Sequence, residues 1–174
     1  NIFFVQARDD VAIGILERLA EEHPSYYTRE ALGRARFFRE NWEEALPFYD
    51  ALVESLSEEE LAAIPQPHRL RAIIYERLDR WSEAEADFKR VLSFAPDDAD
   101  TLNYLGYTWV DRGENLEEAF DMIERALELE PQSGAITDSL GWAYYKLGKY
   151  EQAKTYLEDA VVLTPYSATI IDHL

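Results

Sequence analysis

The 174-residue chain contains no cysteine. This absence excludes disulfide bonds, thiol catalysis and cysteine-ligated zinc, but it leaves the compartment open, because exported and cytosolic proteins can both lack cysteine. No apolar run is long enough to cross a bilayer. The run Ile2-Phe3-Phe4-Val5 is too short for the core of a signal peptide and has no basic flank. The sequence therefore predicts no membrane-spanning segment in these residues.

Motifs of catalysis and nucleotide binding are also missing. There is no Gly-x-Ser-x-Gly elbow and no glycine-rich phosphate loop. The histidines His23, His68 and His173 are far apart, which favours surface or packing roles over metal binding. The run Asp97-Asp98-Ala99-Asp100 lacks the glycine and the distal glutamate of a calcium loop, and a helix dipole explains acidic residues ahead of a helix. We therefore expect no catalytic residue, no metal and no cofactor, with an enzyme only as a residual alternative.

Basic residues are scarce: the chain has 17 basic and 35 acidic residues, which gives a net charge of −18. Such a chain repels phosphate backbones, which argues against nucleic acid as a partner. The excess acid has two interpretations, namely solubility or long-range attraction of basic partners. Hydrophobic residues make up 47% of the chain, so the sequence predicts an ordered protein rather than a disordered one.

Residues 134–167 predict two helices joined by a tight turn. Gly148 should end the first helix in a left-handed conformation, and Pro165 should stop the second. Gly141 and Ala153 are small, so the two helices should approach closely. The apolar positions recur at helical spacing, at Leu140, Gly141, Tyr144 and Leu147 and then at Ala153, Leu157 and Ala160.

The same order recurs one unit earlier. Pro131 precedes Pro165 by 34 residues, and Gly106 precedes Gly141 by 35. The earlier copy consists of Leu105, Gly106, Trp109, Gly113, Ala119, Ile123, Ala126 and Pro131. A small–aromatic–Gly–Ala–Pro signature at this period resembles the tetratricopeptide repeat family, most specifically over residues 99–167. The resemblance implies an all-α fold, a right-handed superhelical α-solenoid of antiparallel helix pairs.

Looser copies extend the pattern over nearly the whole chain. The predicted units are a partial repeat at 1–25, repeats at 26–64, 65–98, 99–133 and 134–167, and a partial repeat at 168–174. Residues 1–7 are expected to end one helix, and residues 10–23 to form the next. Both ends then fall inside a repeat, which predicts a fragment of a longer array. Self-association through the truncated ends is expected from apolar residues there, Ile170, Ile171 and Leu174.

The two upstream repeats depart from the pattern. The first contains an insertion at about 56–64, where Ser57-Glu58-Glu59-Glu60 is a capping box that predicts a short helix at 58–63. Pro47 should remove a hydrogen bond inside a helix and bend it. Arg71 stands where the later repeats have leucine, and Arg36 stands where Tyr144 stands later.

A candidate binding surface follows from the helical wheel of each first helix. Asp138, Trp142 and Tyr145 lie roughly 140–200° away from Leu140, so they point away from the partner helix. In the family that this chain resembles, this face lines a concave groove that holds a partner peptide. The alternative is that these side chains pack against the neighbouring repeat. The candidate residues are Arg34, Phe37, Arg69, Ile73, Arg77, Asn103, Tyr107, Val110, Asp138, Trp142 and Tyr145.

The family's best-known peptide mode clamps a terminal carboxylate with lysine and asparagine. That set is absent at the matching positions, which are Glu30, Arg34, Arg69, Ile73, Asn103 and Tyr107. The sequence instead favours a ligand with acidic residues for the arginines and bulky apolar residues for the aromatic rings. Arginines that merely face solvent, paired with Glu30 or Glu76, are the alternative.

The predicted function is a protein–protein interaction scaffold that binds a partner peptide or helix. The alternative is a structural module that self-assembles or spaces other domains. The repeats at 99–167 also resemble those of Gram-negative bacterial scaffold proteins, some of which are outer-membrane lipoproteins, and this likeness implies a bacterial source. The compartment stays open between the cytoplasm and, if an upstream region carries a signal, the periplasm or outer membrane.

Overall fold

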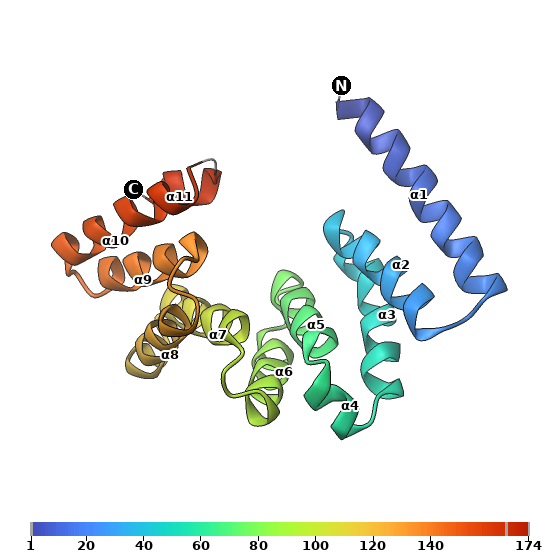
Figure 1. The fold of residues 1–174 in the computed structure, drawn as a ribbon, viewed down its shortest axis with the longest axis horizontal. Helices are drawn as coiled ribbons and strands as arrows, with labels where there is room; N and C mark the ends of the chain where they lie inside the picture. The colour runs from blue at the N-terminus through green and yellow to red at the C-terminus, as the bar shows by residue number, and fades with distance from the viewer. Residues whose placement is uncertain (1, 166, 174) are drawn as a thin grey trace. The chain divides into compact units, whose positions relative to one another are not determined.

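The computed structural model describes residues 2–165 and 167–173, and every regular element in them is a helix (Figure 1). The prediction of an all-α fold is therefore confirmed. The helices are α1 (Ile2–Glu22), α2 (Tyr26–Phe38), α3 (Trp42–Ser55), α4 (Glu58–Ala63), α5 (Gln66–Arg77), α6 (Trp81–Phe94), α7 (Ala99–Arg112), α8 (Leu116–Leu129), α9 (Gly134–Lys146), α10 (Tyr150–Leu163) and α11 (Ala168–His173).

These helices form two compact units, with the boundary between Phe94 and Ala95. In the first unit α2 packs on α3, α5 packs on α6, α3 also contacts α5, and α1 contacts α2. In the second unit the pairs are α7 with α8 and α9 with α10, and α11 lies against both α9 and α10 (Figure 1). We call α2, α5, α7 and α9 the first helices, because each opens a pair.

Each pair turns through a residue in the left-handed region. Gly113 and Gly148 do so in the second unit, with φ of 71° and 72°, as the sequence predicts for Gly148. In the first unit Glu40 and Asp79 adopt φ of 59° and 58° at the same place, although neither is a glycine. The backbone bonds explain why: in every pair the N–H one residue later bonds back to the last turn of the first helix, over 2.8–3.1 Å. The turn geometry is thus common to all four pairs, while its glycine signature is not.

Close approach of the paired helices depends on glycine, as predicted. A Cβ placed on Gly141 would lie 2.8 Å from the Leu157 side chain, and one on Gly106 would lie 2.8 Å from the carbonyl oxygen of Ala119. Real Cβ atoms do not approach other atoms so closely, so a larger residue would push the helices apart. The residue nearest to Gly141 on α10 is Leu157.

The structure corrects one prediction and agrees with another. Residues 1–7 and 10–23 were expected to belong to two helices, but α1 is continuous from Ile2 to Glu22. No glycine or proline lies between positions 6 and 11 to end a helix there. The short helix α4 forms where expected, and its capping box pairs Ser57 with Glu60. Pro47 lies inside α3, which continues to Ser55, and Leu174 lies outside the described residues.

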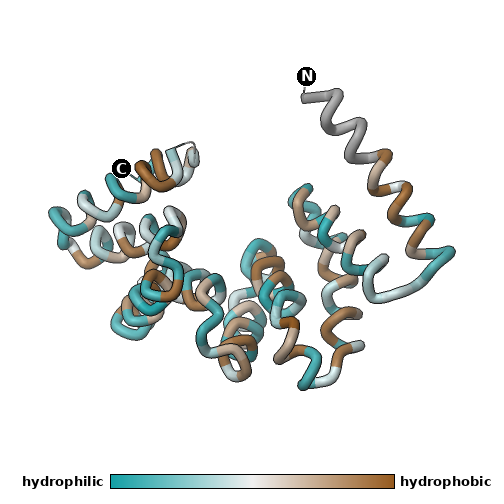
Figure 2. Tube along the Cα trace, in the orientation of Figure 1, coloured by the Kyte–Doolittle hydropathy of each residue, from teal (hydrophilic) through white to brown (hydrophobic). Residues whose placement is uncertain are grey.

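Apolar and polar residues alternate along the helices, as Figure 2 shows by its brown and teal bands. Among the residues that the structure describes, no helix has the length and apolarity to cross a membrane. Small residues at the same position of the second helix of each pair, Ala45, Ala84, Ala119 and Ala153, are buried.

Candidate partner-binding surfaces

In the first unit, the candidate residues divide into buried and exposed ones. Ile73 is buried in the core, and Phe37 packs edge-on against Trp42, with ring centroids 5.1 Å apart. Arg34 and Arg77 are exposed, and Arg69 is partly buried. This unit therefore offers a partner mainly its arginines.

The exposed arginines already have acidic partners. Arg34 pairs with Glu30 over 3.2 Å, and Arg77 pairs with Glu76 over 3.4 Å. Such solvent-exposed ion pairs contribute little to stability, so the guanidinium groups can exchange one carboxylate for another. The alternative given by the sequence, in which Arg34 and Arg77 pair with Glu30 and Glu76 of their own helices, describes the free protein.

We call the side of each first helix that points away from its partner helix the first-helix face. In the second unit, this face of α9 holds a cluster of rings and charges. Trp142 is nearly parallel to Tyr145, with centroids 5.2 Å apart, and to His173 of α11, with centroids 4.6 Å apart. Nδ1 of His173 lies 2.8 Å from Oδ2 of Asp138, which is buried. Tyr145 is 49% exposed, and it also touches Tyr150 at the start of α10. The structure thus brings three of the predicted residues together.

The other candidates of this unit lie on α7. Val110 is buried, and Asn103 and Tyr107 are partly buried. Several polar atoms of this face are enclosed without a hydrogen-bond partner among the described residues, namely Oδ1 of Asn103, Oδ1 of Asp138 and Nε1 of Trp142. Burial raises the pKa of the Asp138 carboxyl, and the contact with His173 opposes this effect.

Local sequence signals position the cluster. Ser133 caps α9 by accepting a bond from the Ile136 N–H over 3.4 Å, and Ser167 accepts one from the Ile170 N–H over 3.5 Å ahead of α11. Each serine therefore sets where its helix begins. Asp138 and Trp142 follow one turn apart on α9, so both side chains face α11.

His173 is the member of the cluster that sequence reasoning missed, since it was assigned a surface or packing role. A signal was present: His173 follows Asp138 by 35 residues, which is the repeat period. The helix α11 lies in the predicted partial repeat at 168–174, at the place of a first helix. Equivalent positions of successive first helices lie side by side in a repeat array, so a residue one period away is a candidate neighbour.

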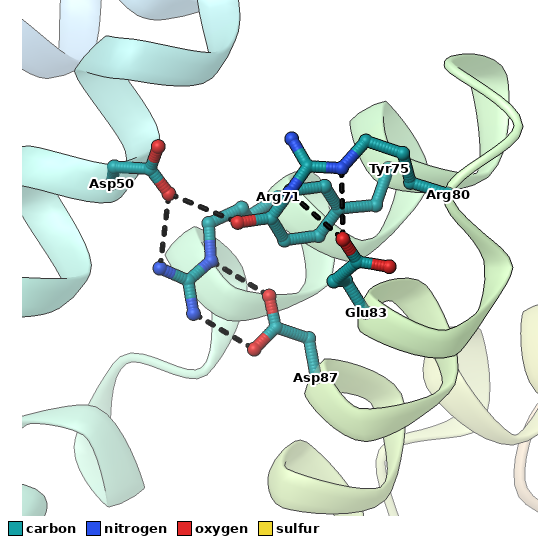
Figure 3. Close-up of polar contacts among 6 residues, drawn as sticks. All are labelled: Asp50, Arg71, Tyr75, Arg80, Glu83 and Asp87. Atoms are coloured by element: carbon teal, nitrogen blue, oxygen red, sulfur yellow. Dashed lines mark hydrogen bonds and ion pairs between the residues drawn. The ribbon is translucent and has the colours of Figure 1, made fainter.

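A polar network in the first unit explains why Arg71 replaces leucine (Figure 3). The Arg71 guanidinium donates to both oxygens of Asp87, over 2.7 and 2.8 Å, and to Asp50 over 3.2 Å. Tyr75 donates its hydroxyl to the same Asp50 oxygen, and Arg80 lies over the Tyr75 ring. Because its donors are used between α3, α5 and α6, Arg71 is a structural residue.

A cleft of about 500 Å³ opens between α1, α2 and α3. On α2 its lining residues Arg29, Leu32 and Arg36 lie on the face opposite Arg34. Arg36 forms ion pairs with Glu17 and Glu44, which neutralise the wall of the cleft. The cleft is therefore a second surface, separate from the first-helix face.

Comparison with known proteins agrees with the helix-pair architecture. Tetratricopeptide repeat models match residues 69–136 and 138–167, and together they cover more than half of the chain. A TPR repeat-containing protein of Pseudomonas aeruginosa is 30% identical over 168 residues. That match covers 95% of this chain and 28% of the Pseudomonas protein, so the chain spans little more than a quarter of its curated relative.

Solved structures share the fold. A crystal structure of MamA has a TM-score of 0.70 at 19% identity, over 95% of this chain and 94% of that one. TTC0263, a thermophilic TPR protein of Thermus thermophilus, has a TM-score of 0.72 at 19% identity, over 98% and 91% of the two chains. YrrB, described as a TPR protein with an unusual peptide-binding site, has a TM-score of 0.66 at 14% identity, over 99% and 86%. This chain belongs to the tetratricopeptide repeat family.

Proposed function

We propose that this chain is a protein–protein interaction scaffold that binds a partner peptide or helix on the first-helix face of its repeats. Proteins of this family generally mediate protein–protein interactions, and the fold is typically a non-catalytic interaction module. The observation that carries the proposal is the ring cluster on α9, where Tyr145 is half exposed beside Trp142. Aromatic side chains at the edge of a packed face are frequent interface anchors.

The two units offer different chemistry to a ligand. The first unit presents Arg34 and Arg77, whose charges suit carboxylates, and the second presents the rings of Trp142 and Tyr145. Peptide binding by YrrB, which shares the fold, supports a peptide as the class of ligand. The partner we expect is therefore a segment that carries both acidic and bulky side chains.

Alanine substitution on the ring cluster tests this function. If the cluster anchors a partner, Trp142→Ala should weaken binding by about 2 kcal/mol or more, with little dependence on salt. Tyr145→Ala should also weaken it, and this change leaves the buried side of the cluster intact. Replacing Arg34 and Arg69 should weaken binding most at low ionic strength, because exposed charges are screened by salt. Titration calorimetry of a captured partner measures all of these effects.

The matched control is Val162→Ala, because Val162 is also 79% exposed but lies on α10, a second helix outside the candidate surface. A partner that binds all of the variants as tightly as the parent would remove the first-helix face from consideration. The cleft between α1, α2 and α3 would then be the next surface to test.

One observation favours the alternative, self-assembly. On α1, Val11, Ile15 and Leu19 recur at every fourth position and are 63%, 51% and 41% exposed. An apolar stripe of this kind on a helix is a typical contact surface between proteins. We propose self-association through α1 as the second candidate function.

A further inference from the structure

We propose that Asp138 and Trp142 form a receptor for a planar cationic side chain, and that an arginine of the partner is its ligand. In the free protein His173 occupies this receptor from within the same chain. This inference rests on the proposed function, because it names the ligand chemistry of the same first-helix face. It changes the expected ligand at α9 from a purely apolar side chain to a cationic one.

The receptor combines a buried carboxylate with an aromatic plane. Asp138 is only 5% exposed, and Trp142 follows it by one helical turn on α9. The His173 ring lies almost parallel to the Trp142 ring, at 18° and 4.6 Å between centroids, while its Nδ1 meets Oδ2 of Asp138 at 2.8 Å. A flat group with an N–H at its edge therefore fits between the two residues.

Histidine leaves half of the carboxylate unused. Oδ1 of Asp138 is buried and has no hydrogen-bond partner in the part of the chain that the structure describes. A buried acceptor without a donor is costly, so the pocket favours any ligand that supplies a second N–H. The imidazole of His173 contacts Oδ2 of Asp138, and Oδ1 is left without a hydrogen bond among the described residues.

A guanidinium group supplies what is missing. It is flat, it donates two parallel N–H bonds to the two oxygens of one carboxylate, and it stacks on aromatic faces. The ammonium group of lysine is a compact point charge that is not flat, so it cannot stack on the ring while it donates two parallel N–H bonds to the carboxylate. Arginine thus matches both the carboxylate and the ring better than histidine or lysine does.

The surrounding charges permit a cation to approach. The chain carries a net charge of −18, which attracts basic partners at long range. Lys146 is a nearby like charge, with its Nζ 5.4 Å from the Trp142 ring centroid. Its ammonium group is held by Asp111, through the carbonyl oxygen at 3.0 Å and the carboxylate at 3.6 Å, so its repulsion is partly compensated.

The helix α11 acts as an internal competitor. Its Ile170 is buried, α11 packs against α9 and α10, and this packing holds His173 over the receptor. A partner's arginine must displace this ring, so removing the imidazole should expose the site. The parent protein should therefore bind arginine more weakly than a variant without His173.

The test uses N-acetyl-arginine amide as the probe, with N-acetyl-lysine amide and N-acetyl-citrulline amide as matched controls. The readout is the indole N–H resonance of Trp142 in a ¹H–¹⁵N spectrum, assigned with Trp142→Phe. The His173→Ala variant should bind the arginine probe about tenfold more tightly than the parent does, because no imidazole competes. It should also prefer arginine to lysine, and to the neutral citrulline, by a similar factor. Adding Asp138→Asn should abolish the preference.

Equal affinity of His173→Ala for the three probes, or an unchanged preference after Asp138→Asn, would overturn the inference. If His173→Ala releases α11 from α9 and α10, the receptor becomes more open. The inference then still requires the variant to prefer the arginine probe to the lysine and citrulline probes. The test is independent of the scaffold function, which is measured by partner binding to Trp142→Ala and Tyr145→Ala. Loss of partner binding in those variants without any arginine preference would leave the scaffold standing and remove the cation receptor alone.

Discussion

At the scale of single residues, Arg71 and Asp87 replace an apolar pair of the repeat. Both are largely buried, and two N–H bonds join them. Breaking a buried ion pair by removing one partner leaves an uncompensated charge, whereas replacing both partners with apolar residues is often neutral or stabilising. At the equivalent positions, the later repeats have Leu105 with Met122 and Leu140 with Tyr156.

We therefore expect Arg71→Leu alone to lower the free energy of unfolding by about 3–5 kcal/mol, because it leaves the buried Asp87 carboxylate without its ion-pair partner. The double variant Arg71→Leu/Asp87→Met, which copies the pair of the next repeat, should be as stable as the parent or more so. Urea unfolding measures both effects. Lys154→Leu is the control, since the Lys154–Glu158 pair is exposed and lies outside this network, so its loss should matter little. A double variant no more stable than Arg71→Leu would contradict this account.

His68 gives the fold a dependence on pH. Burial lowers the pKa of His68 below its usual value, Asp87 opposes this shift, and Arg71 and Arg90 add to it. A depressed pKa in the folded state means that the contribution of neutral His68 is present above the unfolded pKa, near 6.5, and is lost as pH falls through the folded value.

The unfolding free energy should therefore fall more steeply between pH 7 and pH 5 for the parent than for His68→Gln. Denaturant unfolding at several pH values measures the difference. His23→Gln is the matched control, because His23 is exposed, and its slope should follow the parent. Identical slopes for the parent and His68→Gln would refute the role of His68.

At the scale of helices, the pairs depend on a few positions that hold two backbones close together. Gly141 meets Leu157, and Gly106 meets the backbone of Ala119. A Cβ added to Gly14, by contrast, would have nothing within 4 Å, because Gly14 lies on an open part of α1. Glycine is therefore required in α7 and α9 but not in α1.

Gly141→Leu should lower stability by about 1–3 kcal/mol, because overpacking forces the helices apart. Gly14→Ala is the converse control, since it removes the helix penalty of glycine and should raise stability by up to about 1 kcal/mol. Thermal melts followed by circular dichroism give both values. An unchanged midpoint for Gly141→Leu would mean that α9 and α10 are not packed in this way.

Sequence alone predicted the helix pairs well where turn glycines and small residues recur, as at Gly148 and Gly141. It also placed the upstream repeats at 26–64 and 65–98, but it made no prediction about their turns, where Glu40 and Asp79 rather than glycine adopt the left-handed conformation. It also divided α1 into two helices by extending the repeat register, although nothing in the sequence there stops a helix.

The candidate surface was predicted only in part. The wheel identified Asp138, Trp142 and Tyr145, which do lie together on α9. A helical wheel describes one helix at a time, so it could not show which residues of the following segment contact Asp138 and Trp142. This is why His173 was missed. It also could not separate Ile73 and Val110 from the exposed candidates, although the structure buries both.

At the scale of the whole molecule, the exposed stripe on α1 predicts concentration-dependent self-association. Sedimentation equilibrium should show a mass above that of the 20.2-kDa chain at high concentration. Ile15→Glu should restore the monomer, because it puts a charge into the apolar stripe. Tyr27→Glu, at an exposed position off the stripe, should not. A monomer at every concentration would remove self-assembly as a function of α1.

The ion pair between α5 and α6 also bears on how such arrays evolve. Recombination inside the repeat at 65–98 would join an α5 that carries Arg71 to a second helix without Asp87, or the reverse. Either product contains a buried charge without its partner and should be less stable, while exchange of the whole repeat preserves the pair. The bonds from Asp50 to Arg71 and Tyr75 extend that linkage into the preceding repeat. The segment from α3 to α6 should therefore be inherited as one block.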